Sequence, residues 1–201
     1  MQTGTLPFSP ENLLPFDGQT YYFNEFFQKK EANLFLDKLK NQIEWRQEPI
    51  KLFGKTMMQP RLTALYGNPE KPYGYSGIVM QPQPLTDFLM EIKSRVEEKA
   101  NEKFTHVLLN YYRDGKDSMG WHRDNELVLG KNPTIASVRF GATREFQIRH
   151  YLDKKMKIKE ELSHGSLLIM SGSSQHHWEH QIPKTAKCPG PRFNLTFRTI
   201  K

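Results

Sequence analysis

The second half of the chain consists of short strand-like segments separated by turns, and this pattern limits the possible folds more than any other feature. The segments lie at residues 106–112, 134–140, 145–151, 156–159, 166–170 and 193–199. Glycines near their ends, at positions 115, 130, 141, 165, 172 and 190, mark the turns. Many short strands without an internal repeat predict an antiparallel roll of two sheets, because each strand must bury one face against a second layer.

Two segments before the strands have apolar residues at helical spacing. In residues 28–43 these are Ala32, Phe35, Leu36, Leu39 and Ile43, and after Pro84 they are Leu85, Phe88, Leu89, Ile92 and Val96. This spacing puts the apolar side chains on one helix face, and proline is favoured where a helix begins. We therefore expect two amphipathic helices that cover one side of the roll. Residues 1–20, with three prolines among polar residues, are expected to form an irregular lead-in.

The composition agrees with a single soluble domain. The chain has 201 residues, 37% of them hydrophobic, which is enough for a substantial core. The mean hydropathy is -0.70, and the chain lacks a long apolar run. We therefore expect neither a membrane span nor an apolar secretory leader. The 29 Lys and Arg against 22 Asp and Glu favour a polyanionic partner such as nucleic acid. Because Cys188 is the only cysteine, metal chemistry would depend on histidines and carboxylates, and the chain suits a reducing compartment.

His122 and Asp124 form a His-x-Asp pair shortly after the strand-like segment 106–112 and a glycine-containing turn. Two histidines and one carboxylate form the face that holds Fe(II) and leaves the other coordination positions open for oxygen chemistry. A lone His-x-Asp is more often a hydrogen-bonded surface pair. The third ligand is ambiguous on chemistry alone, since His176, His177 and His180 all lie in one stretch.

The last strand-like segment carries a polar face. Because side chains alternate along a strand, Arg192, Asn194, Thr196 and Arg198 share one side of it. Alternation alone favours a half-buried strand with this side in water. If the side faces the inside of the roll, the two arginines must be neutralised by a bound dianion, because unpaired buried charge is expensive. Guanidinium groups suit a small dicarboxylate, since each offers a planar, permanently charged pair of donors.

Six motifs follow one another along the second half of the chain. They are NYYRDG at 110–115, HRDNE at 122–126, IASVRFGA at 135–142, HGSLLIM at 164–170, HWEH at 177–180 and PRFNLTFR at 191–198. In this order and spacing the chain resembles the AlkB family, Fe(II)- and 2-oxoglutarate-dependent dioxygenases that repair alkylated nucleic acid. The resemblance runs from about residue 50 to the C-terminus.

The resemblance implies a ligand set and a fold. It makes His122, Asp124 and His180 the iron ligands, with His177 in reserve. Arg192 and Arg198 would bind the two carboxylates of 2-oxoglutarate, and hydrogen bonds around it would come from Asn110, Tyr112, Asn194 and Thr196. The implied fold class is α+β, mainly β: a jelly roll with helices packed on one side and a lid that recognises the substrate. We expect one domain over residues 1–201, with the lead-in at 1–20, helices and lid at 21–105, and the catalytic core at 106–201.

The resemblance also implies residues that contact the nucleic acid. Residues 50–55 resemble a hairpin that pushes an apolar wedge into a duplex, with Phe53 at its tip. A buried loop aromatic explains Phe53 about equally well. Residues 59–61, which include Arg61, and residues 73–77, which include Tyr73, Tyr75 and Ser76, match the lid. Tyr75 would stack on the flipped base opposite His122, and Glu126 would read its exocyclic amino group, since a carboxylate suits a cationic alkylated base.

Basic residues extend this expected surface. Plausible phosphate contacts are Lys51, Lys55, Arg61, Lys184 and Lys187. Lys155, Lys157 and Lys159 lie along one strand-like segment, where lysines more often protect a sheet edge than line a groove. The wedge segment also shares features with relatives that prefer single strands, so the preferred strand state is open.

The expected function is oxidative repair of N-alkylated bases of the 1-methyladenine and 3-methylcytosine type in DNA. The cofactors implied are Fe(II), 2-oxoglutarate and O2, and the products are formaldehyde, succinate and CO2. The expected protein is a monomer inside the cell, cytoplasmic if bacterial and nuclear if eukaryotic. Two alternatives stay open: a related oxygenase acting on RNA, protein or a small molecule, and a non-enzymatic nucleic-acid binder that keeps the roll.

Overall fold

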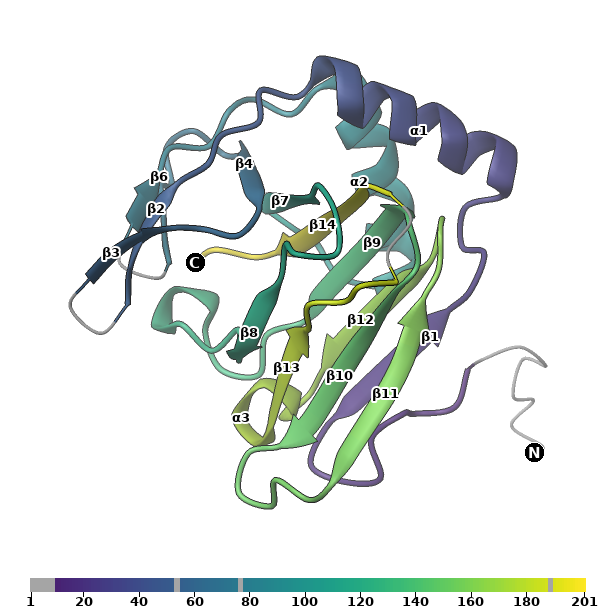
Figure 1. Ribbon diagram of the computed structural model, residues 1–201, viewed down its shortest axis with the longest axis vertical. Coiled ribbons are helices and arrows are strands. Elements are labelled where there is room, and N and C mark those ends of the chain that lie inside the picture. Colours follow the sequence, from purple (N-terminus) through teal and green to yellow (C-terminus); the bar gives the residue numbers. More distant parts are fainter. Residues whose placement is uncertain (1–9, 53–54, 76–77, 188–189) are drawn as a thin grey trace.

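Two antiparallel sheets form the body of the protein, and helices cover the outer side of the larger one (Figure 1). The computed structural model describes residues 10–52, 55–75, 78–187 and 190–201. This arrangement is the jelly roll that the strand pattern predicts. Within those described ranges, neither long helix has the length and apolar character that a bilayer span requires.

The larger sheet has six strands. Their order across the sheet is β1 (Gln19–Phe23), β12 (Leu167–Ser171), β9 (Ile135–Gly141), β14 (Arg192–Arg198), β7 (His106–Tyr112) and β4 (Leu62–Gly67). The last strand of the chain thus lies between two neighbours, with Asn194 opposite Asn110 on one side and Arg139 on the other. A central strand has no free edge, and every residue of β14 is buried. The polar face of β14 is therefore inside the roll, and the interpretation of a water-facing strand is wrong.

The smaller sheet has four strands. Their order is β11 (Lys157–Leu162), β10 (Arg144–His150), β13 (Trp178–Ile182) and β8 (Met119–His122). Strand β11 is an outer strand, and its Lys157 and Lys159 are exposed. This position confirms that the lysine segment is a sheet edge.

Helices α1 (Lys29–Gln42) and α2 (Asp87–Ala100) confirm the two predicted amphipathic segments. Phe35, Leu39, Leu89 and Ile92 belong to one apolar core with the outward-facing residues of the larger sheet, which include Leu195 on β14. A second core between the sheets contains Ile135, Phe146, Leu168 and Trp178 among others. The alternation of β14 thus separates an apolar side, packed on the helices, from a polar side that faces the interior.

Two short hairpins project beside the roll (Figure 1). The first consists of β2 (Pro49–Leu52) and β3 (Lys55–Met58), and the second of β5 (Tyr73–Tyr75) and β6 (Ile78–Met80). Short helical turns also occur at η1 (Leu127–Leu129) and α3 (Ser174–His177). The lead-in differs from expectation at its end, because residues 19–20 already belong to β1. Residues 10–18 contain neither helix nor strand.

Candidate active site

The predicted iron ligands come together at one end of the space between the sheets. His122 ends β8, and His180 lies directly opposite it on the neighbouring strand β13. The ring centroids are 4.2 Å apart. Asp124 follows two residues after His122, and one possible ligand atom from each of the three residues lies within 4.8 Å of the others. Three groups from adjacent segments can therefore share one metal ion.

Both histidines present neutral rings to this cluster. Burial lowers the pKa of His180 to about 3, and His122 adds to the effect. Burial also lowers the pKa of His122, whose Nδ1 lies 2.8 Å from the carbonyl oxygen of Gly120. In the neutral ring an Nδ1–H donates to that carbonyl and leaves Nε2 as the free electron pair for a metal. The donor set therefore fits Fe(II).

Asp124 is held as a carboxylate. Burial favours its neutral form, but opposing charge, that of Arg198 above all, keeps the pKa of Asp124 below its usual value. Oδ2 of Asp124 lies 3.2 Å from a guanidinium nitrogen of Arg198. The backbone N–H of Asp124 donates to Oε1 of Gln175 at 2.9 Å, so α3 fixes the loop that carries this ligand. Gln175 is a residue to which the sequence analysis assigned no role.

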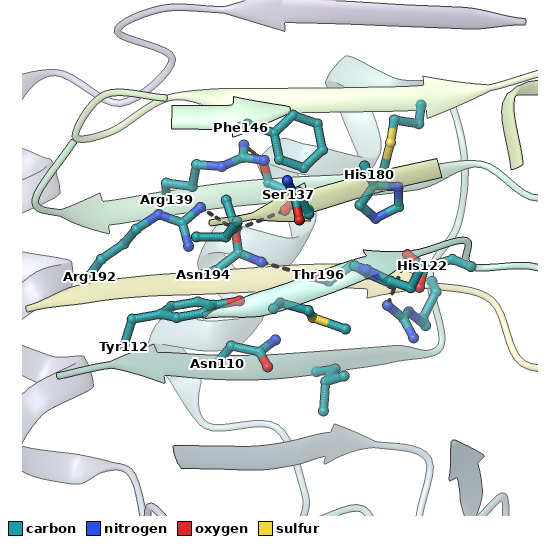
Figure 2. Close-up of a pocket in the computed structure, with 17 residues that line it drawn as sticks. Asn110, Tyr112, His122, Ser137, Arg139, Phe146, His180, Arg192, Asn194 and Thr196 are labelled. Carbon is teal, nitrogen blue, oxygen red and sulfur yellow. Dashed lines mark hydrogen bonds and ion pairs between the residues drawn. The ribbon is translucent and has the colours of Figure 1, made fainter. Parts of the chain in front are cut away.

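A cavity extends from the cluster between the two sheets (Figure 2). Its walls comprise Leu108, Asn110, Tyr112, Met119, His122, Asp124, Ser137, Arg139, Phe146, Met170, His180, Gln181, Ile182, Arg192, Asn194, Thr196 and Arg198. All six residues expected to bind 2-oxoglutarate are among them. Arg198 lies at the metal end beside Asp124, whereas Figure 2 shows Arg192 at the opposite end from His122 and His180. The two arginines are thus spaced along the cavity, as a dicarboxylate with one end at the metal requires.

Hydrogen bonds connect the polar side chains of β14 and β9 that line this cavity. Nη2 of Arg192 donates to Oδ1 of Asn194 at 3.2 Å, and the amide nitrogen of Asn194 donates to Thr196 at 2.8 Å. The hydroxyl of Ser137 donates to the same Oδ1 of Asn194 at 3.1 Å. Alternate residues of β14 and β9 therefore form one connected surface, which limits the rotation of the side chains that would contact a ligand.

Arg139 is the main residue of the cavity that the sequence analysis missed. It lies on β9 opposite Asn194 and is 3% exposed. The signal was present, because alternation along residues 134–140 puts Ser137 and Arg139 on one side and Ala136, Val138 and Phe140 on the other.

Three of the expected base-recognition residues, Arg61, Tyr73 and Glu126, border the metal end. Tyr73 is fully buried; its hydroxyl donates to Oε1 of Glu126 at 3.0 Å and accepts a hydrogen bond from Arg198. Arg61 is 4% exposed, and its Nε donates to Oδ1 of Asn110 at 2.8 Å. An arginine that is buried in this way does not suit a phosphate at the surface, so that expectation for Arg61 is corrected. Lys184 and Lys187 are exposed.

Several expected contacts lie outside the residues that the structure describes. These are Phe53 and Ser76, together with the side chains of Lys51, Lys55 and Tyr75. The backbone of Tyr75 pairs with Ile78 in the second hairpin. The proposed wedge and the stacking residue therefore stay predictions.

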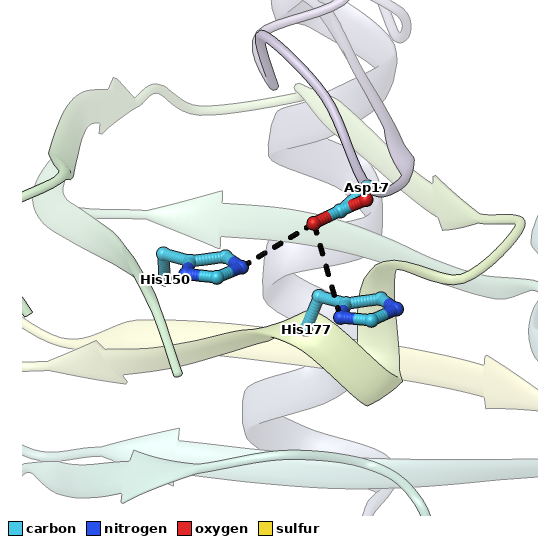
Figure 3. A group of neighbouring side chains, drawn as sticks. All are labelled: Asp17, His150 and His177. Carbon is cyan, nitrogen blue, oxygen red and sulfur yellow. Dashed lines mark ion pairs between the residues drawn. The ribbon is translucent and has the colours of Figure 1, made fainter. Parts of the chain in front are cut away.

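His177, the reserve ligand, belongs to a different cluster with Asp17 and His150 (Figure 3). Nε2 of His150 lies 3.5 Å from Asp17, and Nδ1 of His177 lies 3.9 Å from the same oxygen. Nδ1 of His150 accepts a hydrogen bond from the backbone N–H of Asp153 at 3.1 Å. A neutral ring then carries its proton on Nε2, the atom that a metal would need. This cluster is thus a poorer metal site than the one that contains His180.

Residues 19–198 match the model of the 2OG-Fe(II) oxygenase superfamily, so the match covers both sheets and the whole cavity. The chain resembles mouse alpha-ketoglutarate-dependent dioxygenase alkB homolog 3, with 43% identity over 187 residues, which is 87% of this chain and 64% of that protein. It also resembles the human DNA oxidative demethylase ALKBH2, with 36% identity over 92% of this chain and 74% of that protein. The structure of OsALKBH1 has the same fold, with a TM-score of 0.62 at 16% identity over 90% of this chain and 97% of that one.

The fold, the ligand set and the family match place the chain in the 2OG-Fe(II) oxygenase superfamily. Within that superfamily the chain belongs to the AlkB family. The chain spans just under two thirds of the length of the homolog 3 relative from mouse.

Proposed function

We propose that the protein is an oxidative demethylase that repairs N-alkylated bases in DNA. The observation that carries this proposal is the pairing, in one cavity, of a two-histidine, one-carboxylate cluster with arginines at both ends. Support also comes from the relatives named DNA oxidative demethylase. We propose 1-methyladenine and 3-methylcytosine as substrates because both are cationic.

The cavity residues have separate roles in this proposal. His122, Asp124 and His180 hold Fe(II), which with bound 2-oxoglutarate and O2 supplies the oxidant for the N-alkyl carbon. Arg198 and Arg192 hold the two carboxylates of 2-oxoglutarate. Further hydrogen bonds come from Asn110, Tyr112, Asn194 and Thr196. Phe146 packs against His180, with ring centroids 5.3 Å apart, and helps to exclude water from the metal end. The hydroxylated methyl group then leaves as formaldehyde, and 2-oxoglutarate becomes succinate and CO2.

Glu126 is the strongest candidate for reading the base. Its Oε1 accepts the Tyr73 hydroxyl, whereas Oε2 is buried and has no hydrogen-bond partner among the described residues. A buried carboxylate oxygen without a donor is costly, and the exocyclic amino group of a flipped adenine or cytosine would supply one. We propose that Tyr75 and His122 sandwich that base, with Arg61 and Ser76 completing the lid.

The remaining proposals concern the setting of the reaction. We propose that the nucleic acid is DNA, contacted by Phe53 as a wedge and by Lys51, Lys55, Lys184 and Lys187 along the backbone. We propose a single domain over residues 1–201 that works as a monomer inside the cell, in the cytoplasm of a bacterium or the nucleus of a eukaryote.

The test is formaldehyde release from oligonucleotides that carry one 1-methyladenine or 3-methylcytosine. Each is offered as single-stranded DNA, duplex DNA and RNA, with a methylated peptide as the comparison. We expect turnover on DNA that requires Fe(II) and 2-oxoglutarate, and its loss in His180→Ala but not in His177→Ala, the matched histidine outside the cluster. Turnover only on the peptide, or none on any substrate by protein that retains Fe(II), would contradict the proposal.

A further inference from the structure

A third arginine shares the cavity with Arg192 and Arg198. Arg139 projects from β9 into the space between the sheets, and Figure 2 shows it near Arg192, away from His122 and His180. In the strand register Arg139 is opposite Asn194, which lies two residues after Arg192 on β14. The end of the cavity far from the metal cluster therefore has two guanidinium groups.

The protein itself compensates the charge of Arg139 only in part. Nη1 donates to the carbonyl oxygen of Ser137 at 2.9 Å, and the guanidinium lies 5.5 Å from the ring centroid of Phe146. Nε is buried and has no hydrogen-bond partner among the described residues. Burial, and then the positive charge of Arg192, hold the pKa of Arg139 well below its usual value. Because a guanidinium stays protonated in proteins, this shift shows how poorly the cavity walls alone stabilise the charge.

A carboxylate at this end of the cavity would compensate the positive charge of Arg139 and Arg192. Among the described residues that line the cavity, Asp124 is the only carboxylate, and it lies at the metal end beside Arg198. A dicarboxylate bound through its oxo-acid end at the metal would bring its second carboxylate towards Arg192 and Arg139. Two guanidinium groups can satisfy both oxygens of one carboxylate, and the anion would relieve their mutual repulsion.

We propose that Arg139 is a second binding residue for the far carboxylate of 2-oxoglutarate, beside Arg192, and thereby selects dicarboxylates over monocarboxylates. This inference rests on the proposed function. It extends to the product, because succinate keeps the same far carboxylate after the other end is oxidised. Arg139 therefore holds both co-substrate and product, and its loss should weaken both.

The test measures binding without turnover. The protein is loaded with Mn²⁺, and its affinities for 2-oxoglutarate, succinate and 2-oxopentanoate are compared by calorimetry. The last ligand has the same oxo-acid end but no far carboxylate. In Arg139→Met we expect affinity for 2-oxoglutarate and succinate to fall by roughly tenfold to a hundredfold, the usual effect of losing a charged hydrogen bond. Affinity for 2-oxopentanoate should stay within about twofold, since its contacts are unchanged.

Two further variants separate binding from structure. Arg139→Lys keeps the charge and should bind 2-oxoglutarate more tightly than Arg139→Met; if the methionine variant does not fold, the lysine variant is compared with the native protein. Arg144→Met is the matched control, because Arg144 is equally buried but donates to the backbone carbonyls of Asp114, Asp117 and Pro183. It should bind all three ligands as the native protein does.

The outcomes are distinguishable. Unchanged affinity for 2-oxoglutarate in Arg139→Met, or an equal loss for 2-oxopentanoate, would overturn the role of Arg139 and leave the proposed function standing. If the native protein binds no 2-oxoglutarate, the proposed function fails, and this inference fails with it. A melting temperature of ligand-free Arg139→Met at or above that of the native protein would support the inference, because the variant removes the repulsion with Arg192.

Discussion

The ion pair of Asp124 and Arg198 should control the stability of the metal-free protein. Asp124 is 5% exposed and Arg198 is 4% exposed, so neither charge can be solvated by water alone. Asp124→Asn keeps the shape of the side chain and the backbone contact with Gln175, but removes the negative charge. Arg198 then keeps its hydrogen bond to Tyr73 and loses its nearest counter-charge.

The magnitude follows from the burial of both partners. Removing one partner of a buried pair costs about 3–5 kcal/mol, and a domain of this size loses about 2–4 °C per kcal/mol, so we expect the Tm to fall by about 6–20 °C. The assay is thermal unfolding followed by fluorescence, in buffer with a chelator and without 2-oxoglutarate. The double variant Asp124→Asn with Arg198→Met is the control, and it should recover part of the loss because no unpaired cation remains. An unchanged Tm in Asp124→Asn would refute the reasoning.

Three further predictions address the base, the duplex and the helical layer. Glu126→Gln should lower kcat/KM for 3-methylcytosine by about tenfold, measured as formaldehyde release, because a neutral amide attracts a cationic base less; an unchanged value would exclude Glu126 as the reader. Phe53→Ala should reduce activity on duplex DNA far more than on single strands, and equal losses would count against the wedge. Burial raises the pKa of Glu97, but Lys93 and the Phe104 N–H outweigh this and keep it below the usual value. The stabilisation by Glu97 is therefore present above the unfolded pKa of about 4.3 and is lost as the pH falls through the folded value. Glu97→Gln should lower the Tm at pH 7, and this difference in Tm should shrink as the pH is lowered through the folded pKa. A Tm difference that does not depend on pH would contradict this.

Local patterns predicted the elements that depend on neighbouring residues. The helical spacing of Phe35, Leu39 and Ile92 predicted both long helices, because an amphipathic face is visible within a few turns. The six strand-like segments correspond to six strands. Strands β4, β8 and β13 were missed. The residues of β8 and β13 include Gly120, His122, Glu179 and His180 and do not alternate between apolar and polar types.

Local patterns alone could not predict properties that depend on distant neighbours; for these the sequence analysis relied on the family resemblance. The polar side of β14 is buried because β7 and β9 flank it and the smaller sheet covers it, and no local pattern contains that information. The choice between His177 and His180 likewise depends on pairing, because only His180 lies opposite His122. Arg139 shows both cases. Alternation along its strand predicts the side on which it lies, whereas its burial beside Arg192 follows only from the packing of the two sheets.

The central claim is that His122, Asp124 and His180 bind one metal ion while the arginines bind 2-oxoglutarate. Crystals soaked with Mn²⁺ and 2-oxoglutarate without oxygen test it most directly, since anomalous scattering locates the metal. We expect one strong peak within coordinating distance of these three residues, with the far carboxylate of 2-oxoglutarate beside Arg192 and Arg139. A metal peak at Asp17, His150 and His177 instead, or a ligand elsewhere, would contradict the account.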